Sequence, residues 1–158
     1  MKAKPACQSC VPTFFARLLG FDVVARSETA NAAAEELARH TKYAFIDKNT
    51  GTYPEYIHTP ASTAKGFLTW LHSNLTQKNL YSIEFSWKKE RKGHILTVQK
   101  DESGTVKLYD PQINETVLGD DKIKKYLENI KIKTINLMNI SNCEINETVC
   151  KKIMKAAK

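Results

Sequence analysis

Long hydrophobic runs are missing from this sequence. No run of about 18 or more apolar residues occurs in its 158 positions, so no segment is expected to cross a bilayer as a helix. The opening MKAKPACQSC lacks the apolar core of a secretory signal peptide. Repeats, low-complexity tracts and linkers are also absent. With 42% hydrophobic residues the chain can bury one core, so we expect a single domain over residues 1–158, which could be excised from a longer polypeptide.

Acidic residues are fewer than basic ones, 17 against 24, and the net charge is +7. The lysines are spread over residues 88–92, 122–133 and 151–158, which is typical of solvated helices and tails. No stripe of interleaved basic and aromatic residues indicates single-stranded nucleic-acid binding. We therefore expect neither nucleic acid nor a membrane among the partners.

Cysteine is also scarce, with four residues in the chain. A disulfide framework suits small secreted domains, whereas this chain is long and rich in core residues. A zinc site would need Cys7-x2-Cys10 together with Cys143-x6-Cys150, but the second spacing is loose and no histidine lies near it. We expect no metal and no organic cofactor. Free thiols remain, one of them catalytic; the alternative is that the N-terminal pair only packs in the core or binds a partner.

Hydrophobic periodicity predicts an α+β fold in which helices come first and antiparallel strands follow. A helix over 60–75 is indicated by Thr59 as N-cap and Pro60 in the first turn. The remaining predicted helices are 11–19, 28–39, 120–129 and 146–157, and the predicted strands are 43–46, 80–87 and 133–139.

Residues 93–112 alternate in the manner of a β-hairpin around the turn cluster Asp101-Glu-Ser-Gly104. His94 shares one face of the first strand with two apolar residues, and Asp110 shares one face of the second strand in the same way. A register that pairs residue 98 with 106 would pair 94 with 110. The hairpin therefore predicts a histidine oriented by a carboxylate.

A nucleophile for this pair is available near the N-terminus. A thiol is a good nucleophile only as thiolate, and its pKa falls at a helix N-terminus or beside an imidazolium. Cys7 and Cys10 adjoin an apolar helix, which we expect to pack Phe14, Phe15 and Leu18 against the hairpin. Cysteine at the start of a core helix, with a histidine held by a carboxylate on a facing sheet, is the papain-type arrangement.

Two motifs carry a resemblance to a known family. The run ACQSCVPTFFARLLGFDVVAR (6–26) looks like the opening of the papain-fold toxin domains of bacterial polymorphic toxins and phage minor-head proteins. The run KGHILTVQKDESGTVKLYDPQ (92–112) is similar to their second signature, Gly-His, a hairpin and Asp-Pro-Gln. The closing INLMNISNCEIN (135–146) resembles the end of the phage-associated branch. The sequence departs at Ala6, where the family has Asn, and at Leu19-Gly20-Phe21, where it has Arg-Gly-Tyr.

This resemblance implies a papain-like α+β fold, with N-terminal helices packed on an antiparallel sheet. It also implies a toxin or effector that uses Cys7, His94 and Asp110 for acyl transfer on a protein, most simply deamidation of a glutamine side chain. Cysteine peptidase and transglutaminase use the same thioester. A non-catalytic phage-head or interaction module is the alternative of another class.

The identity of the nucleophile stays open at this point. The family pattern puts it at Cys7, whereas Cys-Gln-Ser-Cys looks locally like papain itself, which favours Cys10. Pro12 also favours Cys10, because proline suits the first helical turn and a helix starting at Val11 would place it there. Gln8 is a candidate oxyanion donor, as is Gln112, which could instead orient the imidazole.

The resemblance further implies partners and a place of action. The expected partners are a host or competitor protein as substrate, and a cognate immunity or carrier protein. The domain would be secreted or delivered, and would act in the cytosol of a target cell, where a reducing environment keeps thiols free.

Overall fold

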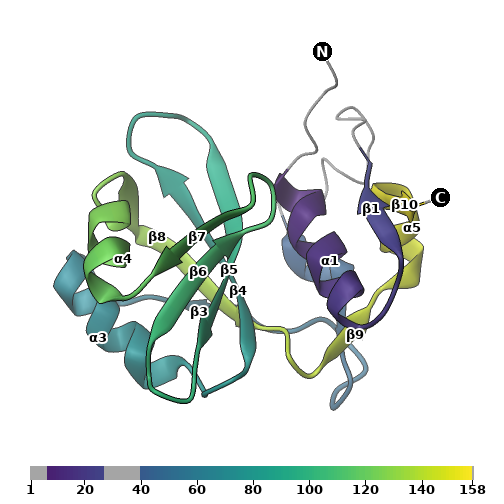
Figure 1. Ribbon diagram of the computed structural model, residues 1–158, viewed down its shortest axis with the longest axis horizontal. Helices are drawn as coiled ribbons and strands as arrows, with labels where there is room; N and C mark the ends of the chain where they lie inside the picture. The colour runs from purple at the N-terminus through teal and green to yellow at the C-terminus, as the bar shows by residue number, and fades with distance from the viewer. Residues whose placement is uncertain (1–6, 27–39, 158) are drawn as a thin grey trace. The chain divides into compact units, whose positions relative to one another are not determined.

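The computed structural model describes residues 7–26 and 40–157, and the chain divides into two compact units (Figure 1). The first unit comprises segments within residues 1–54, 111–113 and 142–158, and the second comprises residues 55–110 and 114–141. The chain thus leaves the first unit after Pro54, returns to it briefly at residues 111–113, and returns again from Asn142. The single domain expected over residues 1–158 stays a prediction.

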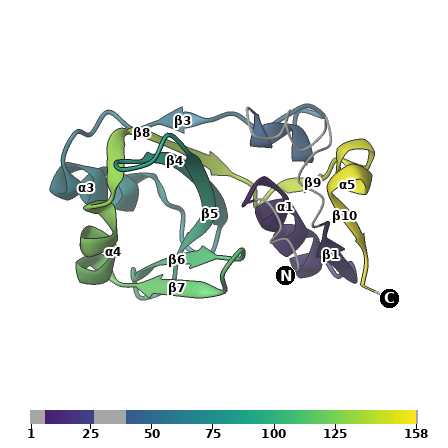
Figure 2. The ribbon, with the colours of Figure 1, turned by 90° about the horizontal axis from the view of Figure 1, so that it is seen from above.

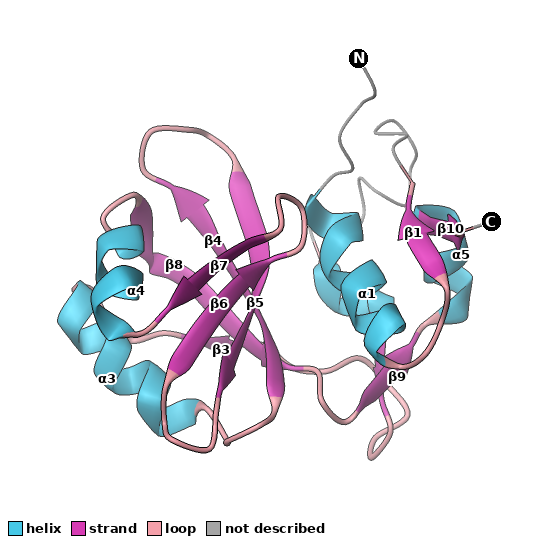
Figure 3. Ribbon diagram, viewed as in Figure 1, coloured by secondary structure: helices cyan, strands magenta, loops and turns pink. Residues whose placement is uncertain are grey.

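The second unit contains a six-stranded sheet in which every neighbouring pair of strands is antiparallel (Figure 3). The strand order is β3-β8-β4-β5-β6-β7. The strand bounds are Ile57–His58 for β3, Leu80–Trp87 for β4, Gly93–Lys100 for β5, Val106–Asp110 for β6, Glu115–Leu118 for β7 and Ile130–Asn139 for β8. The predicted strand 80–87 is confirmed, and the predicted strand 133–139 begins earlier, at Ile130.

Two helices, α3 (Ala64–Asn74) and α4 (Asp120–Leu127), lie beside each other on one side of this sheet (Figure 2). Alternation along the strands turns their apolar side chains toward the helices, and together they form one buried cluster. The largest fully buried members are Phe67, Leu71, Leu96, Ile123, Ile130, Ile135 and Leu137. The core of this unit therefore lies between the sheet and the helix pair.

The start of α3 corrects the predicted helix over 60–75. The helix is capped by Thr63, whose hydroxyl accepts a hydrogen bond of 3.1 Å from the Gly66 N–H. Thr59 instead accepts a hydrogen bond of 3.0 Å from the Ala61 N–H, in a local turn before the helix. Both threonines can act as N-caps. Thr63 caps the helix because the apolar residues that follow it pack in the core.

The first unit combines short strands with α1 (Cys7–Leu18) and α5 (Glu147–Ile153). Strand β1 (Val23–Ala25) pairs with β10 (Met154–Ala156), and β2 (Phe45–Asp47) pairs with β9 (Cys143–Ile145), both antiparallel. Each pair joins an N-terminal segment to a C-terminal one. These strands and helices together confirm the α+β class for the described part of the chain.

Several predicted elements of this unit differ from the structure. The predicted strand 43–46 is a 3-10 turn, η1 (Thr41–Ala44), followed by β2. The predicted helix 146–157 ends at Ile153 and continues as β10, because pairing with β1 supplies extended-chain hydrogen bonds. The predicted helix 28–39 lies outside the described residues.

Helix α1 packs inside the first unit through Phe15, which is 4% exposed and meets the ring of Phe45 edge to face at 5.5 Å between centroids. Leu18, which we expected to be buried against the hairpin, is 60% exposed. The buried side of α1 therefore includes Val11, Phe15 and Ala16 but not Leu18.

Candidate active site

Helix α1 begins at Cys7, four residues before the predicted start. Pro12 consequently lies inside the helix and cannot donate the N–H that the carbonyl of Gln8 would accept. The hydroxyl of Thr13 donates to the Ser9 carbonyl at 2.6 Å. The predicted start near Val11 was wrong, because burial of the apolar face outweighs the cost of an internal proline. This removes the argument from Pro12 that favoured Cys10 as nucleophile, and the local likeness of Cys-Gln-Ser-Cys to papain remains.

The two candidate nucleophiles differ in their place on α1. Cys7 is the first residue of α1, and in general the N–H groups and the dipole at a helix start favour a thiolate. Cys10 lies almost one turn further along, and its side chain is buried, with 6% exposed. A thiol that must reach a protein substrate is better placed at the helix start. The candidate oxyanion donor Gln8 follows Cys7 directly on this helix.

His94 and Asp110 are brought together in the second unit, as the sequence predicts. The Nε2 atom of His94 lies 2.5 Å from Oδ2 of Asp110, and the residues are 9% and 5% exposed. Hydrogen bonds to an ionised partner are the short, strong class. A neutral imidazole that donates through Nε2 carries its basic lone pair on Nδ1. Nδ1 is thus the atom that can exchange a proton with a thiol.

The strand register that produces this contact is not the predicted one. Val98 is opposite Leu108, rather than Val106, so the ladder is shifted by two residues. Continued by one step, this ladder would put Asp110 opposite Leu96. His94 is two residues from Leu96 on the same strand face, so His94 and Asp110 are diagonal cross-strand neighbours. Diagonal neighbours on one face are within reach of long side chains. A two-residue shift preserves the face, so the predicted pair forms although the predicted pairing is wrong.

The turn explains the shift. The Asp101 N–H donates to the Thr105 carbonyl at 2.9 Å, so these two residues still belong to the ladder. The carboxylate of Asp101 also accepts from the N–H groups of Ser103 and Thr105, both at 2.9 Å. Only residues 102–104 form the loop, and Gly104 adopts φ +85°, as the last residue of a three-residue hairpin loop commonly does. The prediction had counted Asp101 as part of the turn.

Two aromatic rings of β4 contact His94. The indole of Trp87 stacks on the imidazole at 5.4 Å between centroids and 25° between planes. Phe85, the cross-strand partner of His94, meets it edge to face at 5.9 Å. Tyr126 of α4 contacts both Phe85 and Trp87. The histidine–carboxylate pair is therefore held in an apolar surrounding that limits its movement.

Tyr126 is also electrostatically linked to the pair. Burial raises the pKa of its phenol far above the usual value, and the negative charges of Asp110 and Glu115 raise it further. The phenol of Tyr126 therefore stays neutral at physiological pH. Sequence reasoning missed Tyr126 altogether, because nothing in 120–129 places one face of that helix near the end of β6. Phe85 and Trp87 are two residues apart in the predicted strand 80–87, so they share one strand face, and this alternation indicates that both face the same neighbour.

The remaining candidate, Gln112, lies in the turn 111–114 between β6 and β7, two residues after Asp110. Its suggested part in orienting the imidazole or the oxyanion stays a prediction, as do the catalytic roles of the other candidates. Cys143 and Cys150 are both buried, and burial raises the pKa of their thiols to about 11 and about 12. Such thiols are poor nucleophiles at neutral pH.

Within 7–26 and 40–157, no three His, Cys, Asp or Glu side chains gather as a metal ion would require. None of the helices in this part of the chain is long and apolar enough to cross a membrane.

Comparison with known proteins gives one family. A family model described as papain fold toxin 1, glutamine deamidase, matches residues 6–114, a stretch that contains Cys7, His94 and Asp110. Among solved structures, the Pseudomonas avirulence protein AvrPphB is similar with a TM-score of 0.40 and 17% sequence identity, over 68% of this chain and 56% of that one. The chain thus spans little more than half of that protein's length. No curated protein matches the sequence significantly.

Proposed function

Because this chain belongs to the papain fold toxin 1, glutamine deamidase family, we propose that it deamidates a glutamine side chain of a target protein. Family membership confirms the papain-like α+β fold and, in general terms, a toxin-type cysteine hydrolase. The substrate, the catalytic residues and the place of action are the proposed part. The observation that carries the proposal is the buried hydrogen bond between His94 and Asp110.

In the proposed reaction, the thiolate of Cys7 attacks the side-chain carboxamide carbon of glutamine. The oxyanion that forms is stabilised by N–H groups at the start of α1, with Gln8 as a further donor. His94 gives a proton to the departing nitrogen, so ammonia leaves and a thioester remains. His94 then takes a proton from water, which attacks the thioester and releases glutamate and the thiolate. Asp110 holds the imidazole and stabilises its protonated form.

Cys7 is preferred over Cys10 for two reasons taken from the fold. It is the first residue of α1, where a thiolate is stabilised, and Cys10 is buried. Neither reason depends on how the two units of the fold meet. The proposal requires that they bring the Cys7 thiol to Nδ1 of His94.

Expression in the cytosol of a susceptible cell tests the proposal. Wild type is expected to be harmful, and Cys7→Ser is expected to relieve the harm, because a hydroxyl is far less acidic than a thiol. Cys143→Ala is the matched control: it removes a buried thiol remote from the start of α1 in sequence, and should remain harmful. Mass spectrometry of the cellular proteins should show a gain of about 1 Da at particular glutamines when Cys7 is intact.

Other outcomes assign other activities. New protein termini in place of deamidated glutamines would mean a peptidase that uses the same thioester. Harm that survives Cys7→Ser but is lost on Cys10→Ser would move the nucleophile to Cys10. Harm that survives both substitutions would defeat the enzyme hypothesis and favour a binding module. A delivered domain that acts in a target-cell cytosol, and a cognate immunity or carrier protein, belong to this proposal.

A further inference from the structure

A basic loop is attached directly to the proposed reaction centre. Residues 88–92, Lys-Lys-Glu-Arg-Lys, connect β4 to β5, and all five are exposed. The loop follows Trp87, whose ring stacks on His94, and it ends two residues before His94. Its place relative to His94 is therefore set within one unit of the fold. Four cations and one anion give the loop a net charge of +3.

The ends of the loop are held by the sheet and its positive charge is not neutralised. The Trp87 N–H donates to the Lys92 carbonyl at 3.1 Å, and the Lys88 N–H donates to the Asn129 carbonyl at 2.9 Å. Among the residues that the structure describes, no carboxylate forms an ion pair with a loop cation. Exposed Lys131, opposite Ser86 in β8, adds a further positive charge nearby. The loop therefore presents a positive field beside His94.

A cavity of about 290 Å³ lies beside the first residues of the loop. Its lining combines an aromatic wall, two lysines, two carboxylates and an amide, contributed by Trp87, Lys88, Lys89, Glu90, Glu128 and Asn129. Trp87 is already stacked on His94 rather than offered as a platform for a nucleic-acid base. A lining of mixed charge suits a peptide, with its alternating donors and acceptors.

We infer that this loop and the adjoining cavity are the docking surface for an acidic segment of the protein substrate. The inference rests on the proposed function, because it takes His94 as the point that the substrate glutamine must reach. Asp and Glu side chains a few residues from that glutamine would meet the cations at positions 88, 89, 91 and 92. The substrate class is thus a protein whose target glutamine lies in an acidic stretch.

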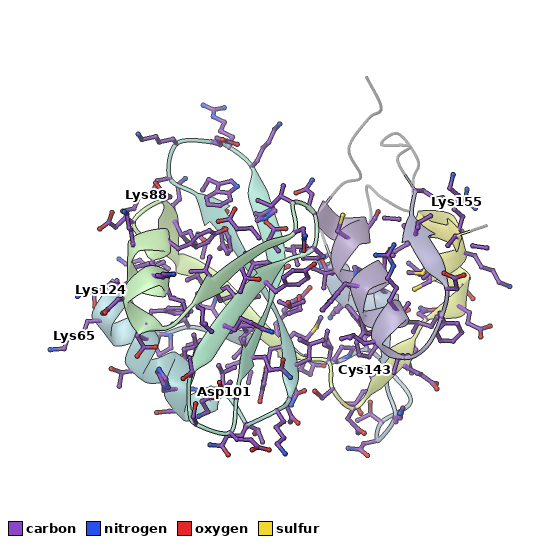
Figure 4. All side chains as sticks on the ribbon, in the orientation of Figure 1. Lys65, Lys88, Asp101, Lys124, Cys143 and Lys155 are labelled. Atoms are coloured by element: carbon purple, nitrogen blue, oxygen red, sulfur yellow. The ribbon has the colours of Figure 1, made fainter. Side chains whose placement is uncertain are left out.

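Binding is tested in the Cys7→Ser protein, so that no turnover complicates the measurement. The probes are two fluorescein-labelled peptides of about 12 residues with a central glutamine, one with four Glu and one with four Lys around it. The loop variant is Lys88→Gln/Lys89→Gln/Lys92→Gln. The matched control is Lys65→Gln/Lys107→Gln/Lys124→Gln, which removes the same charge from exposed positions on α3, β6 and α4 (Figure 4 labels Lys65, Lys88 and Lys124).

At about 50 mM salt the acidic peptide should bind more tightly than the basic one, and at about 200 mM salt its affinity should fall. The loop variant should lose roughly fivefold or more in affinity and the control less than about twofold, since exposed pairs contribute little individually. Equal losses in the two variants would overturn the inference, because net charge alone would then explain binding. Equally tight, loop-dependent binding of an oligothymidylate of matched charge would also overturn it, and would indicate a nucleic-acid surface.

Deamidation of the same peptides by the wild-type enzyme separates this inference from the proposed function. Binding of the acidic peptide at the loop with no deamidation of any glutaminyl substrate would refute the proposed function and leave the docking surface intact. Equal deamidation of the acidic and basic peptides would refute the docking surface and leave the proposed function intact.

Discussion

Thiol reactivity distinguishes the cysteines of this chain by environment, and it gives the sharpest test of the proposed nucleophile. Cys143 and Cys150 are 1% and 2% exposed. Burial raises the pKa of Cys143 to about 11, and the charge of Asp47 acts in the same direction. Burial raises the pKa of Cys150 to about 12, and its thiol donates to the Ala44 carbonyl at 3.6 Å. Both thiols should resist alkylation in the folded protein.

The size of the difference follows from the thiolate fractions. At pH 6, pKa values of about 11 and about 12 leave roughly one thiolate in 10⁵ and 10⁶, whereas an ordinary thiol near 8.5 has about 3 in 1,000. Cys143 and Cys150 should therefore react at least about 300-fold more slowly than an ordinary thiol, before steric protection is counted. The proposed mechanism pairs Cys7 with the imidazolium of His94, and under it Cys7 should react faster than an ordinary thiol.

The assay is iodoacetamide treatment near pH 6, followed by peptide mapping with mass spectrometry at several times. We expect one label, on Cys7, in the native protein, and comparable labelling of all four cysteines in denaturant. His94→Ala should abolish the reactivity of Cys7 at this pH while leaving Cys143 and Cys150 unlabelled. Cys7→Ser should leave the native protein unlabelled.

Three results would refute the reasoning in different ways. Equal slow labelling of all four cysteines would contradict a catalytic thiolate. Full labelling of Cys7 in the His94→Ala protein would show that no ion pair links the two residues. A native label on Cys10 in place of Cys7 would mean that its burial is lost in solution and that it is the nucleophile.

Three further predictions concern stability and the histidine site. Asp110→Asn should keep the fold but lower the free energy of unfolding by about 1–2 kcal/mol, as measured by urea unfolding. It should also lower kcat/KM roughly 100-fold or more, because the imidazole of His94 loses its charged partner. Near-normal kcat/KM in this variant would contradict the role of Asp110. Trp87→Phe should preserve activity, because a ring still stacks on His94. Trp87→Ala should lower the free energy of unfolding by roughly 2–3 kcal/mol and should also lower activity, because His94 loses its stacked ring. Equal activity of the two variants would count against a role for stacking. The raised pKa values of Cys143 and Cys150 predict that the free energy of unfolding falls as pH rises from the ordinary thiol pKa of 9.0 toward about 11 and 12, because the unfolded thiols ionise while the folded ones stay protonated. Urea unfolding at several pH values should show a shallower fall for the double variant Cys143→Ala/Cys150→Ala. An unchanged slope would contradict the raised pKa values.

The local hydrophobic pattern was sufficient to predict an element and its inward face wherever one face of that element is buried. Alternation along β4, β5 and β6 identified the strands and the face that carries His94 and Asp110, because side chains alternate strictly along a strand. A register error of two residues leaves that face unchanged, so the predicted pair could form despite it. The motif around Cys7 and the hairpin also led to the family that the comparison supports.

Choices between equivalent local signals needed the tertiary structure. Thr59 and Thr63 are equally good caps in sequence, and only packing of the following helix selects the second. Asp101 could end a strand or begin a turn, and the hydrogen bond from its backbone N–H to the Thr105 carbonyl continues the ladder through it. Residues after Ile153 continue as β10 because β1, more than a hundred positions earlier, supplies the partner strand.

Local periodicity fixed which side chains share a face of each element: Leu96 and Val98 with His94, and Val106 and Leu108 with Asp110. It could do so because the 2.0 and 3.6 periods are properties of the backbone itself. Only the tertiary structure decided which faces meet, such as the face of α4 that brings Tyr126 near Asp110, and which helix start leaves Pro12 inside α1. These choices depend on packing against other elements, and the free energy of that packing is contained in no short window of sequence.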